Sequence, residues 1–172
     1  MSRSQLSALV VAALFLAGCR EATTPALAPG PGDTKSSSDS DVASVRAFLA
    51  DAEKKFNTND PDIFMPIFTD DAVIMSQGSP DIKGHDAIRA GYVDALKQVG
   101  MELTFASGEV QVLGDLAYEQ GTYTVKMLDK ASHQVVQEIK NRHIHILRRH
   151  PDGTWKTWRM MTNSAEPAVP AK

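Results

Sequence analysis

The sequence predicts an α+β domain in which helices come first and a strongly curved antiparallel sheet follows. Two observations support this class. Apolar residues recur at three- and four-residue steps over much of residues 42–99, which is typical of amphipathic helices. Beyond Gly100, four long β-type segments are separated by turn signals. Helices can cover one face of such a sheet, and its concave side can hold a pocket.

The helical half divides into three helices and one short strand. The first helix is predicted over 42–58 and carries the apolar positions Val42, Val45, Phe48, Leu49, Ala52 and Phe56. A polar run, residues 57–60, ends it. Pro61 then favours the first turn of a second short helix, with Asp60 as its N-cap. A short strand is predicted over 72–76, and Gly84 opens a third helix that runs to Val99.

The second half predicts four strands joined by tight turns. Their expected ranges are 102–113, 116–128, 135–149 and 154–162. Gly114-Asp115 predicts one hairpin turn, and His150-Pro151-Asp152-Gly153 predicts another.

The N-terminal residues predict export. Arg3 precedes an uncharged apolar stretch from Leu6 to Leu16, which is too short for a membrane-spanning helix of roughly 20 residues. The run Leu16-Ala17-Gly18-Cys19 resembles the lipobox of bacterial lipoproteins, whose cysteine is lipidated and becomes the mature N-terminus. The residue after this cysteine is Arg20 and not Asp. In a Gram-negative cell this would favour anchoring of the protein in the outer membrane, facing the periplasm. A signal for soluble secretion is the alternative.

Composition sets the domain boundaries. Residues 1–18 form the predicted signal peptide, and residues 19–41, rich in Pro, Gly and polar side chains, form a flexible tether. One domain is expected over 42–164, followed by a disordered tail over 165–172. Removing residues 1–18 takes away one Arg and no acid, so the formal charge moves from −3 to −4, and nucleic acid is not an expected partner. Cys19 is the only cysteine, so the folded part can form no internal disulfide.

Five segments of the domain together form a recognisable pattern: Phe68 to Met75, Ile82 to Ile88, Val110 to Ala117, Asp152 to Lys156 and Asn163-Ser164. With these segments the domain resembles the SnoaL-like, nuclear-transport-factor-2-like superfamily. It implies a cone-shaped curved sheet with three N-terminal helices packed on its concave face. Members include ketosteroid isomerase, polyketide cyclases, dehydratases, limonene epoxide hydrolase and domains without known activity, so the fold alone does not select a chemistry.

The resemblance argues against steroid isomerase chemistry. Isomerase members use a carboxylate base with a tyrosine and a protonated acid at the oxyanion. Here the base position falls on Ser76, the tyrosine position near Ala52, and the acid position on His145. Related members often carry Asp where Met160 stands and Trp where Thr162 stands, so this chain departs from that pattern as well.

The predicted pocket face combines aromatic side chains and a methionine with few polar groups. It contains Tyr123, His143, His145, Trp158 and Met160. Strand alternation places both histidines on one face. The expected register pairs His145 with Trp158 and His143 with Met160.

The histidine pair could also carry chemistry. His145 could act as a general acid or base, with Glu119 or Asn141 holding its tautomer and Tyr123 donating a hydrogen bond. The pair could ligate one ion if Glu119 or His133 supplied a third ligand. Most often such histidines only line a pocket, so we predict no metal and no other cofactor.

Three functions therefore stay open at the level of sequence. The leading one is a lipid-anchored domain that binds a small, largely apolar molecule in its cone. The second is an isomerase, dehydratase or hydrolase that uses His145. The third is an envelope module that binds another protein through the apolar sheet face of Ile144 and Ile146, and the same face predicts a homodimer.

Overall fold

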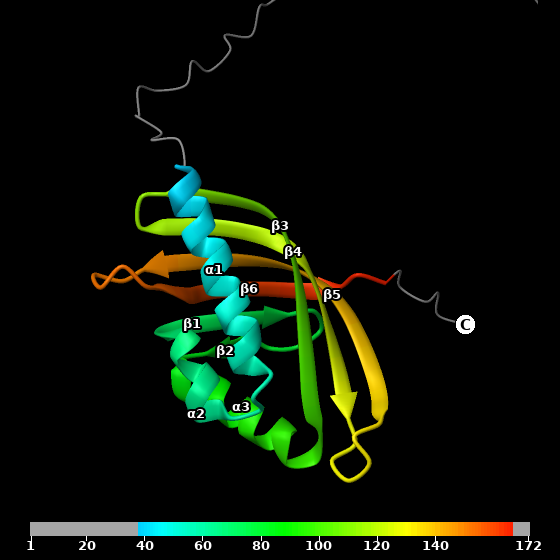
Figure 1. Cartoon of the computed structure of the whole chain (residues 1–172). Helices are drawn as coiled ribbons and strands as arrows, with labels where there is room; N and C mark the ends of the chain where they lie inside the picture. Colours follow the sequence, from blue (N-terminus) through cyan, green and yellow to red (C-terminus); the bar gives the residue numbers. More distant parts are fainter. Residues whose placement is uncertain (1–37, 167–172) are drawn as a thin grey trace, which may run out of the picture. The chain divides into compact units, whose positions relative to one another are not determined.

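The computed structural model describes residues 38–166, which form three α-helices, one 3₁₀ helix and six strands (Figure 1). The predicted signal peptide, Cys19, most of the tether and most of the tail lie outside these residues. None of the helices over 38–166 is long and apolar enough to cross a membrane. The elements in chain order are α1 (Asp39–Phe56), α2 (Pro61–Phe64), η1 (Met65–Ile67), β1 (Phe68–Ser76), β2 (Ile82–Lys83), α3 (His85–Gln98), β3 (Gly100–Leu113), β4 (Leu116–Leu128), β5 (Val135–Arg149) and β6 (Trp155–Ser164).

Helix α1 begins three residues earlier than predicted, within the range assigned to the tether. Ser38 is its N-cap and accepts a hydrogen bond from the backbone N–H of Asp41, which satisfies one of the free donors of the first turn. The buried positions are those that the periodicity selects: Val45, Leu49, Ala52 and Phe56.

The two other helices start as their sequences predict. The Asp60 side chain accepts a hydrogen bond from the backbone N–H of Asp62, and Pro61 occupies the first turn of α2. Gly84 enters α3 with a φ of 86°, which a residue with a Cβ adopts only with strain. Both helix starts therefore coincide with local signals that are visible in the sequence.

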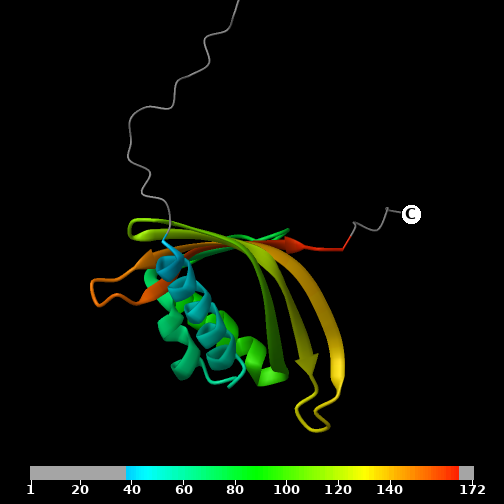
Figure 2. The ribbon, with the colours of Figure 1, turned by 45° about the horizontal axis from the view of Figure 1, so that its top comes forward.

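The six strands form one sheet in the order β2-β1-β6-β5-β4-β3. All neighbours are antiparallel except β1 and β6, which run parallel. The sheet bends strongly, and the helices lie on its concave side (Figure 2). The α+β class, the curved sheet and the placement of the helices are therefore confirmed. Strands β4 and β5 have the predicted bounds.

The free edge of β3 is held by side chains from α1 and the segment after it. Asn57 donates to the carbonyl of Leu103 and accepts from its N–H, at 2.9 and 2.7 Å. Asn59 makes the same pair of bonds with Met101, at 2.8 and 2.6 Å. Glu53 accepts another N–H of this strand at 2.7 Å. These bonds satisfy an edge that would otherwise be open for pairing with another chain.

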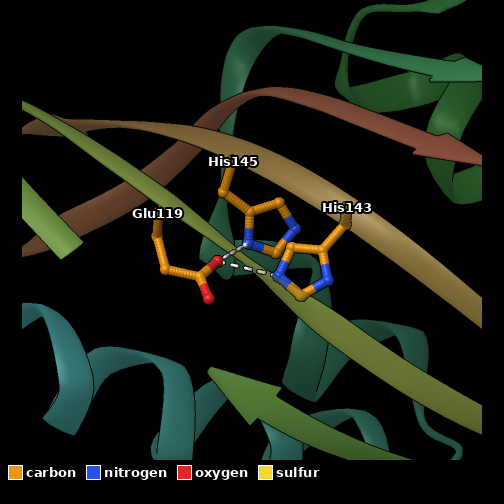
Figure 3. A group of neighbouring side chains, drawn as sticks. All are labelled: Glu119, His143 and His145. Carbon is orange, nitrogen blue, oxygen red and sulfur yellow. Dashed lines mark hydrogen bonds and ion pairs between the residues drawn. The ribbon is translucent and has the colours of Figure 1, made fainter. Parts of the chain in front are cut away.

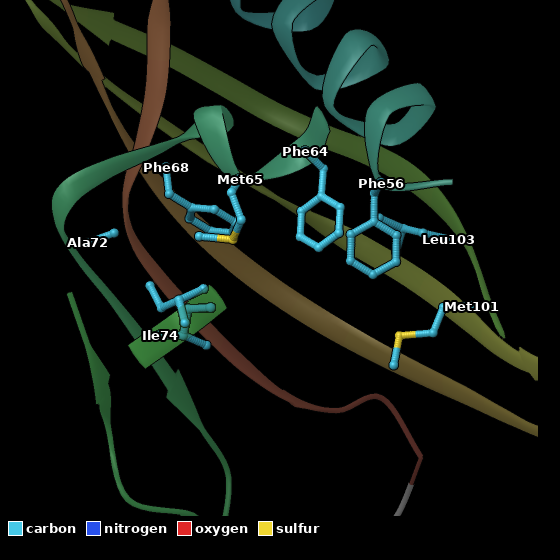
Figure 4. Close-up of a cluster of buried hydrophobic side chains, with 9 residues drawn as sticks. Phe56, Phe64, Met65, Phe68, Ala72, Ile74, Met101 and Leu103 are labelled. Carbon is cyan, nitrogen blue, oxygen red and sulfur yellow. The ribbon is translucent and has the colours of Figure 1, made fainter. Parts of the chain in front are cut away.

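The core consists of two clusters of buried apolar side chains. The larger one contains Phe56, Phe64 and Ile88 and joins the helices to β1 and β3 (Figure 4). The smaller one packs α1 against strands β3 to β6 and includes Leu49 and Trp155. Members of both clusters contribute to the wall of the cavity described next.

Candidate functional site

A cavity of about 240 Å³ lies between the helices and the concave face of the sheet. Its wall is mostly apolar and includes Phe48 and Ala52 of α1, Phe105 of β3 and Met160 of β6. The side chains in the wall that carry polar atoms are Tyr92, Tyr123, Asn141, His145 and Thr157. An apolar hollow with few polar groups is the usual form of a small-molecule site.

Three of the five residues predicted for the pocket line this cavity: Tyr123, His145 and Met160. His143 is buried beside His145, with 4% of its surface exposed, and is not part of the wall. Trp158 lies on the outer face of the sheet, where its indole N–H donates to Asp71 at 2.9 Å. The placement of Trp158 in the pocket is therefore wrong.

The error comes from the register of β5 and β6. His145 pairs with Met160 and His143 with Thr162, each two residues beyond the predicted partner. At the hairpin Arg149 pairs with Trp155, which accounts for one residue of the shift. A bulge accounts for the other. Pairing passes from Leu147↔Thr157 directly to Ile146↔Arg159, so Trp158 is the extra residue, and beyond it the inward positions change parity.

On the outer face, Trp158 is enclosed by charged side chains. The guanidinium carbons of Arg148 and Arg159 each lie 4.1 Å from the centroid of a Trp158 ring. These cation–π contacts and the bond to Asp71 give this tryptophan a structural role on the sheet surface.

Beneath the cavity, Glu119 of β4 meets His143 and His145 of β5 (Figure 3). Adjacent strands place them together, because Glu119 pairs with His145 and Gly121 with His143. The Glu119 Oε2 atom lies 2.8 Å from His143 Nε2 and 3.4 Å from His145 Nδ1. Their exposed fractions are 0%, 4% and 3%, in sequence order. We call these three residues the Glu-His-His cluster.

The electrostatics of the cluster favour a carboxylate ion and a neutral His145. Burial by itself raises the pKa of Glu119, but the hydrogen bond with His143 and the contact with His145 outweigh it, so the pKa falls to about 2. Burial lowers the pKa of His145, and the neighbouring Glu119 only partly opposes this. Phe105 packs edge-on against both imidazoles, with ring centroids 5.5 and 5.9 Å apart, and keeps the surroundings apolar.

Several polar atoms of the cluster have no hydrogen-bond partner among residues 38–166. They are Glu119 Oε1, His143 Nδ1 and both ring nitrogens of His145, since the 3.4 Å contact to Glu119 lacks hydrogen-bond geometry. A buried polar atom without a partner costs about 1–3 kcal/mol. Such a concentration in one place marks the cluster as a candidate functional site.

The other partners considered for the histidines lie elsewhere. Asn141 lines the cavity but donates to the hydroxyl of Tyr123 at 2.8 Å, and that hydroxyl also bonds Thr162 at 2.8 Å. His133 is exposed in the turn between β4 and β5 and does not belong to the cluster. Of the candidates for a third ligand or an orienting group, Glu119 is therefore the one that meets the histidines.

One residue that positions the cluster was not identified from the sequence. Gly121 lies opposite His143, and a Cβ there would come within 3.1 Å of Glu119 Oε1 and 2.4 Å of the carbonyl oxygen of Ala106. The missing side chain leaves room for the carboxylate. A glycine inside a predicted strand is the signal that could have indicated a close approach.

The outer face of the sheet carries the apolar residues that predicted a homodimer. Ile144 and Met161 pair side by side and are 40% and 52% exposed, and Ile146 is half-buried. The oligomeric state stays a prediction.

Fold and site define a cone-type α+β domain with an apolar cavity. A sequence profile of the SnoaL-like domain matches residues 45–158, and the chain belongs to this family. No curated protein matches the chain.

Solved structures agree on the fold. A ketosteroid isomerase-like protein from Erwinia carotovora atroseptica is 25% identical, with a TM-score of 0.64 over 76% of this chain and 100% of that one. A conserved protein from Planctomyces limnophilus is 19% identical, with a TM-score of 0.65 over 72% and 95%. Aln2 from a Streptomyces species is 20% identical, with a TM-score of 0.64 over 74% and 92%.

Proposed function

We propose that this SnoaL-like domain binds one small, largely apolar molecule in its cavity. The volume of about 240 Å³ supports a ligand of one or two rings. It exceeds the roughly 150 Å³ of an apolar cavity that accepts benzene and is below the roughly 300 Å³ at which drug-sized pockets begin.

The polar atoms in the wall indicate what else the ligand carries. Asn141 and Tyr123 bond each other, whereas neither ring nitrogen of His145 has a hydrogen-bond partner in the part of the chain that the structure describes. His145 therefore keeps both of its buried ring nitrogens available to a ligand. This single observation carries the proposal that the ligand has one polar group, such as a hydroxyl or a carbonyl, directed at His145.

A pair of matched variants tests ligand binding. Ala52 lines the cavity and Ala50 is exposed on the same helix. We expect Ala52→Leu to weaken binding at least about tenfold, because the added atoms occupy ligand volume, and Ala50→Leu to leave it unchanged. The measurement is isothermal titration calorimetry of the full chain with benzene, phenol, indole and 2-naphthol. Equal affinities in the two variants, or no binding by the wild type, would contradict the proposal.

A second candidate function is turnover of the bound molecule, with His145 transferring a proton. The observation that favours it is the carboxylate of Glu119 at 3.4 Å from His145 Nδ1, because a small rotation of the imidazole would form a hydrogen bond that fixes the tautomer of a catalytic histidine. Mass spectrometry of ligands incubated with the chain tests it. A product formed by the wild type and by Ala50→Leu but absent with His145→Ala supports turnover, and unchanged ligands refute it.

We also propose export and lipid anchoring at Cys19, which lies outside the residues that the structure describes. The support is the run Leu16 to Cys19 after an apolar segment. In a Gram-negative host we expect the wild type to incorporate labelled fatty acid and to pellet with outer membranes, and Cys19→Ser to do neither. A Cys19→Ser variant that is labelled and pelleted like the wild type would refute anchoring at this residue.

A further inference from the structure

We propose that Glu119, His143 and His145 form a binding site for one divalent transition-metal ion of the zinc or ferrous type. This inference concerns the Glu-His-His cluster beneath the cavity and does not depend on the identity of the cavity ligand.

The geometry of the donor atoms carries the proposal. Glu119 Oε2 lies 2.8 Å from His143 Nε2 and 3.4 Å from His145 Nδ1, and one donor atom of each residue lies within 4.8 Å of the others. A tetrahedral ion with bonds of about 2.0–2.1 Å holds its ligands roughly 3.3 Å apart. Small side-chain rotations therefore bring the three atoms to metal-binding distances.

Burial provides a second, independent observation. All three side chains are at least nine-tenths buried. Among the described residues, Glu119 Oε1, His143 Nδ1 and both nitrogens of His145 lack hydrogen-bond partners. Within residues 38–166, the ion-pair contacts of Glu119 are to these two histidines. A cation bound here would neutralise the buried carboxylate and would use ring nitrogens that have no partner within these residues.

The donors are also held by rigid elements. They come from β4 and β5, and every residue of β4 from Leu116 to Met127 pairs with a residue of β5 without interruption. Gly121 leaves the space that the carboxylate occupies. Preorganised donors on adjacent strands distinguish this cluster from exposed acidic groups, whose side chains must be ordered before they can bind an ion.

The donor types select the ion. Two imidazoles and one carboxylate are the set used for catalytic zinc and for non-haem ferrous iron, whereas Mg²⁺ and Ca²⁺ prefer oxygen ligands. Metal-binding histidines usually donate their second N–H to a partner, and its loss weakens affinity by about 10–100-fold. Because His143 Nδ1 and His145 Nε2 have no such partner over the described range 38–166, we expect weaker binding than at a fully supported site.

The position of the ion would link it to the cavity. His145 belongs both to the cluster and to the cavity wall. An ion on Nδ1 would leave Nε2 as the nitrogen of His145 that can serve a ligand. A cavity ligand and a bound ion can therefore be present together.

Calorimetric titration of the chelator-treated full chain with Zn²⁺ tests the site. We expect one ion per chain for the wild type, and an affinity at least about 100-fold lower for Glu119→Gln and His143→Asn, because the loss of a direct ligand costs more than the loss of an outer partner. His133→Ala removes an exposed histidine and is the matched control, which should bind as the wild type does. A wild type without a saturable site, or equal affinities in all variants, would overturn the proposal.

Two measurements on the wild type alone protect the test against misfolded variants. Zn²⁺ should raise the Tm of the chain and Mg²⁺ should not, because only an ion that binds the folded state stabilises it. Co²⁺ should give the intense visible absorption of a four-coordinate site with nitrogen ligands. No Tm shift with Zn²⁺ together with a Co²⁺ spectrum like that of the free aqueous ion would equally refute the site.

Discussion

Substitution of Gly121 by alanine tests how the sheet makes room for the Glu-His-His cluster. The new Cβ would lie 2.4 Å from the carbonyl oxygen of Ala106 and 3.1 Å from Glu119 Oε1. The first of these neighbours is a backbone atom that cannot rotate away. Strands β3 and β4 must therefore move apart by about 0.6 Å before the distance from the new Cβ to this oxygen reaches 3.0 Å. Overpacking of this kind costs about 1–3 kcal/mol. The free energy of unfolding should fall by that amount, and Zn²⁺ binding should weaken if the cluster holds the ion.

The matched control is Gly91→Ala in helix α3. A Cβ at Gly91 meets nothing within 4 Å, and alanine in a helix interior is about 0.5–1 kcal/mol more favourable than glycine. The two substitutions should therefore change stability in opposite directions. Urea unfolding of the full chain, followed by circular dichroism, measures both. With a slope of about 2 kcal/mol/M, a loss of about 2 kcal/mol lowers the midpoint by about 1 M. A Gly121→Ala variant with the stability of the wild type would refute the steric argument.

Three further predictions concern other parts of the domain. Asn57→Ala should lower the free energy of unfolding by about 1–3 kcal/mol in the same urea assay, because it removes both bonds to Leu103 on the edge strand. Trp158→Phe should leave the affinity for cavity ligands within about twofold by calorimetry, since this side chain lies on the outer face. In the presence of chelator, stability should fall as the pH drops from about 4.5 toward 2, by on the order of 3 kcal/mol, because the folded-state pKa of Glu119 is about 2, below its unfolded value. The lowered pKa of His145 acts in the same direction as the pH falls below about 6.5. Glu119→Gln should remove the lower part of this dependence, and an unchanged acid profile in that variant would show that Glu119 is not its source.

Local sequence signals correctly predicted the helix starts and hairpin turns that depend on residues close together in the sequence. Asp60 and Pro61 start α2, Gly84 starts α3, and Gly114 and Gly153 adopt positive φ in the two hairpin turns. The glycines and Pro61 act through their own backbone preferences, and Asp60 acts through a side-chain cap two residues away, so their effect is visible in the sequence. The first helix began earlier than predicted because a serine in a polar, low-complexity run serves as its cap.

The candidate site was predicted only in part. His145, Tyr123 and Met160 line the cavity, and Glu119 was recognised as a partner for His145. Trp158 was misplaced because a single bulge in β6 reverses which side chains point inward, and a bulge leaves no periodic signal in one sequence.

The sequence by itself determined the α+β class, the bounds of β4 and β5, and the alternation that places both histidines on one face of the sheet, because these depend on residue preferences and on the period of two within a strand. Only the tertiary structure decided that Glu119 meets those histidines, that Gly121 leaves space for its carboxylate, and that Trp158 lies outside. Register between strands, bulges and the burial of charge arise from contacts between distant parts of the chain. Periodicity within one segment carries no information about such contacts.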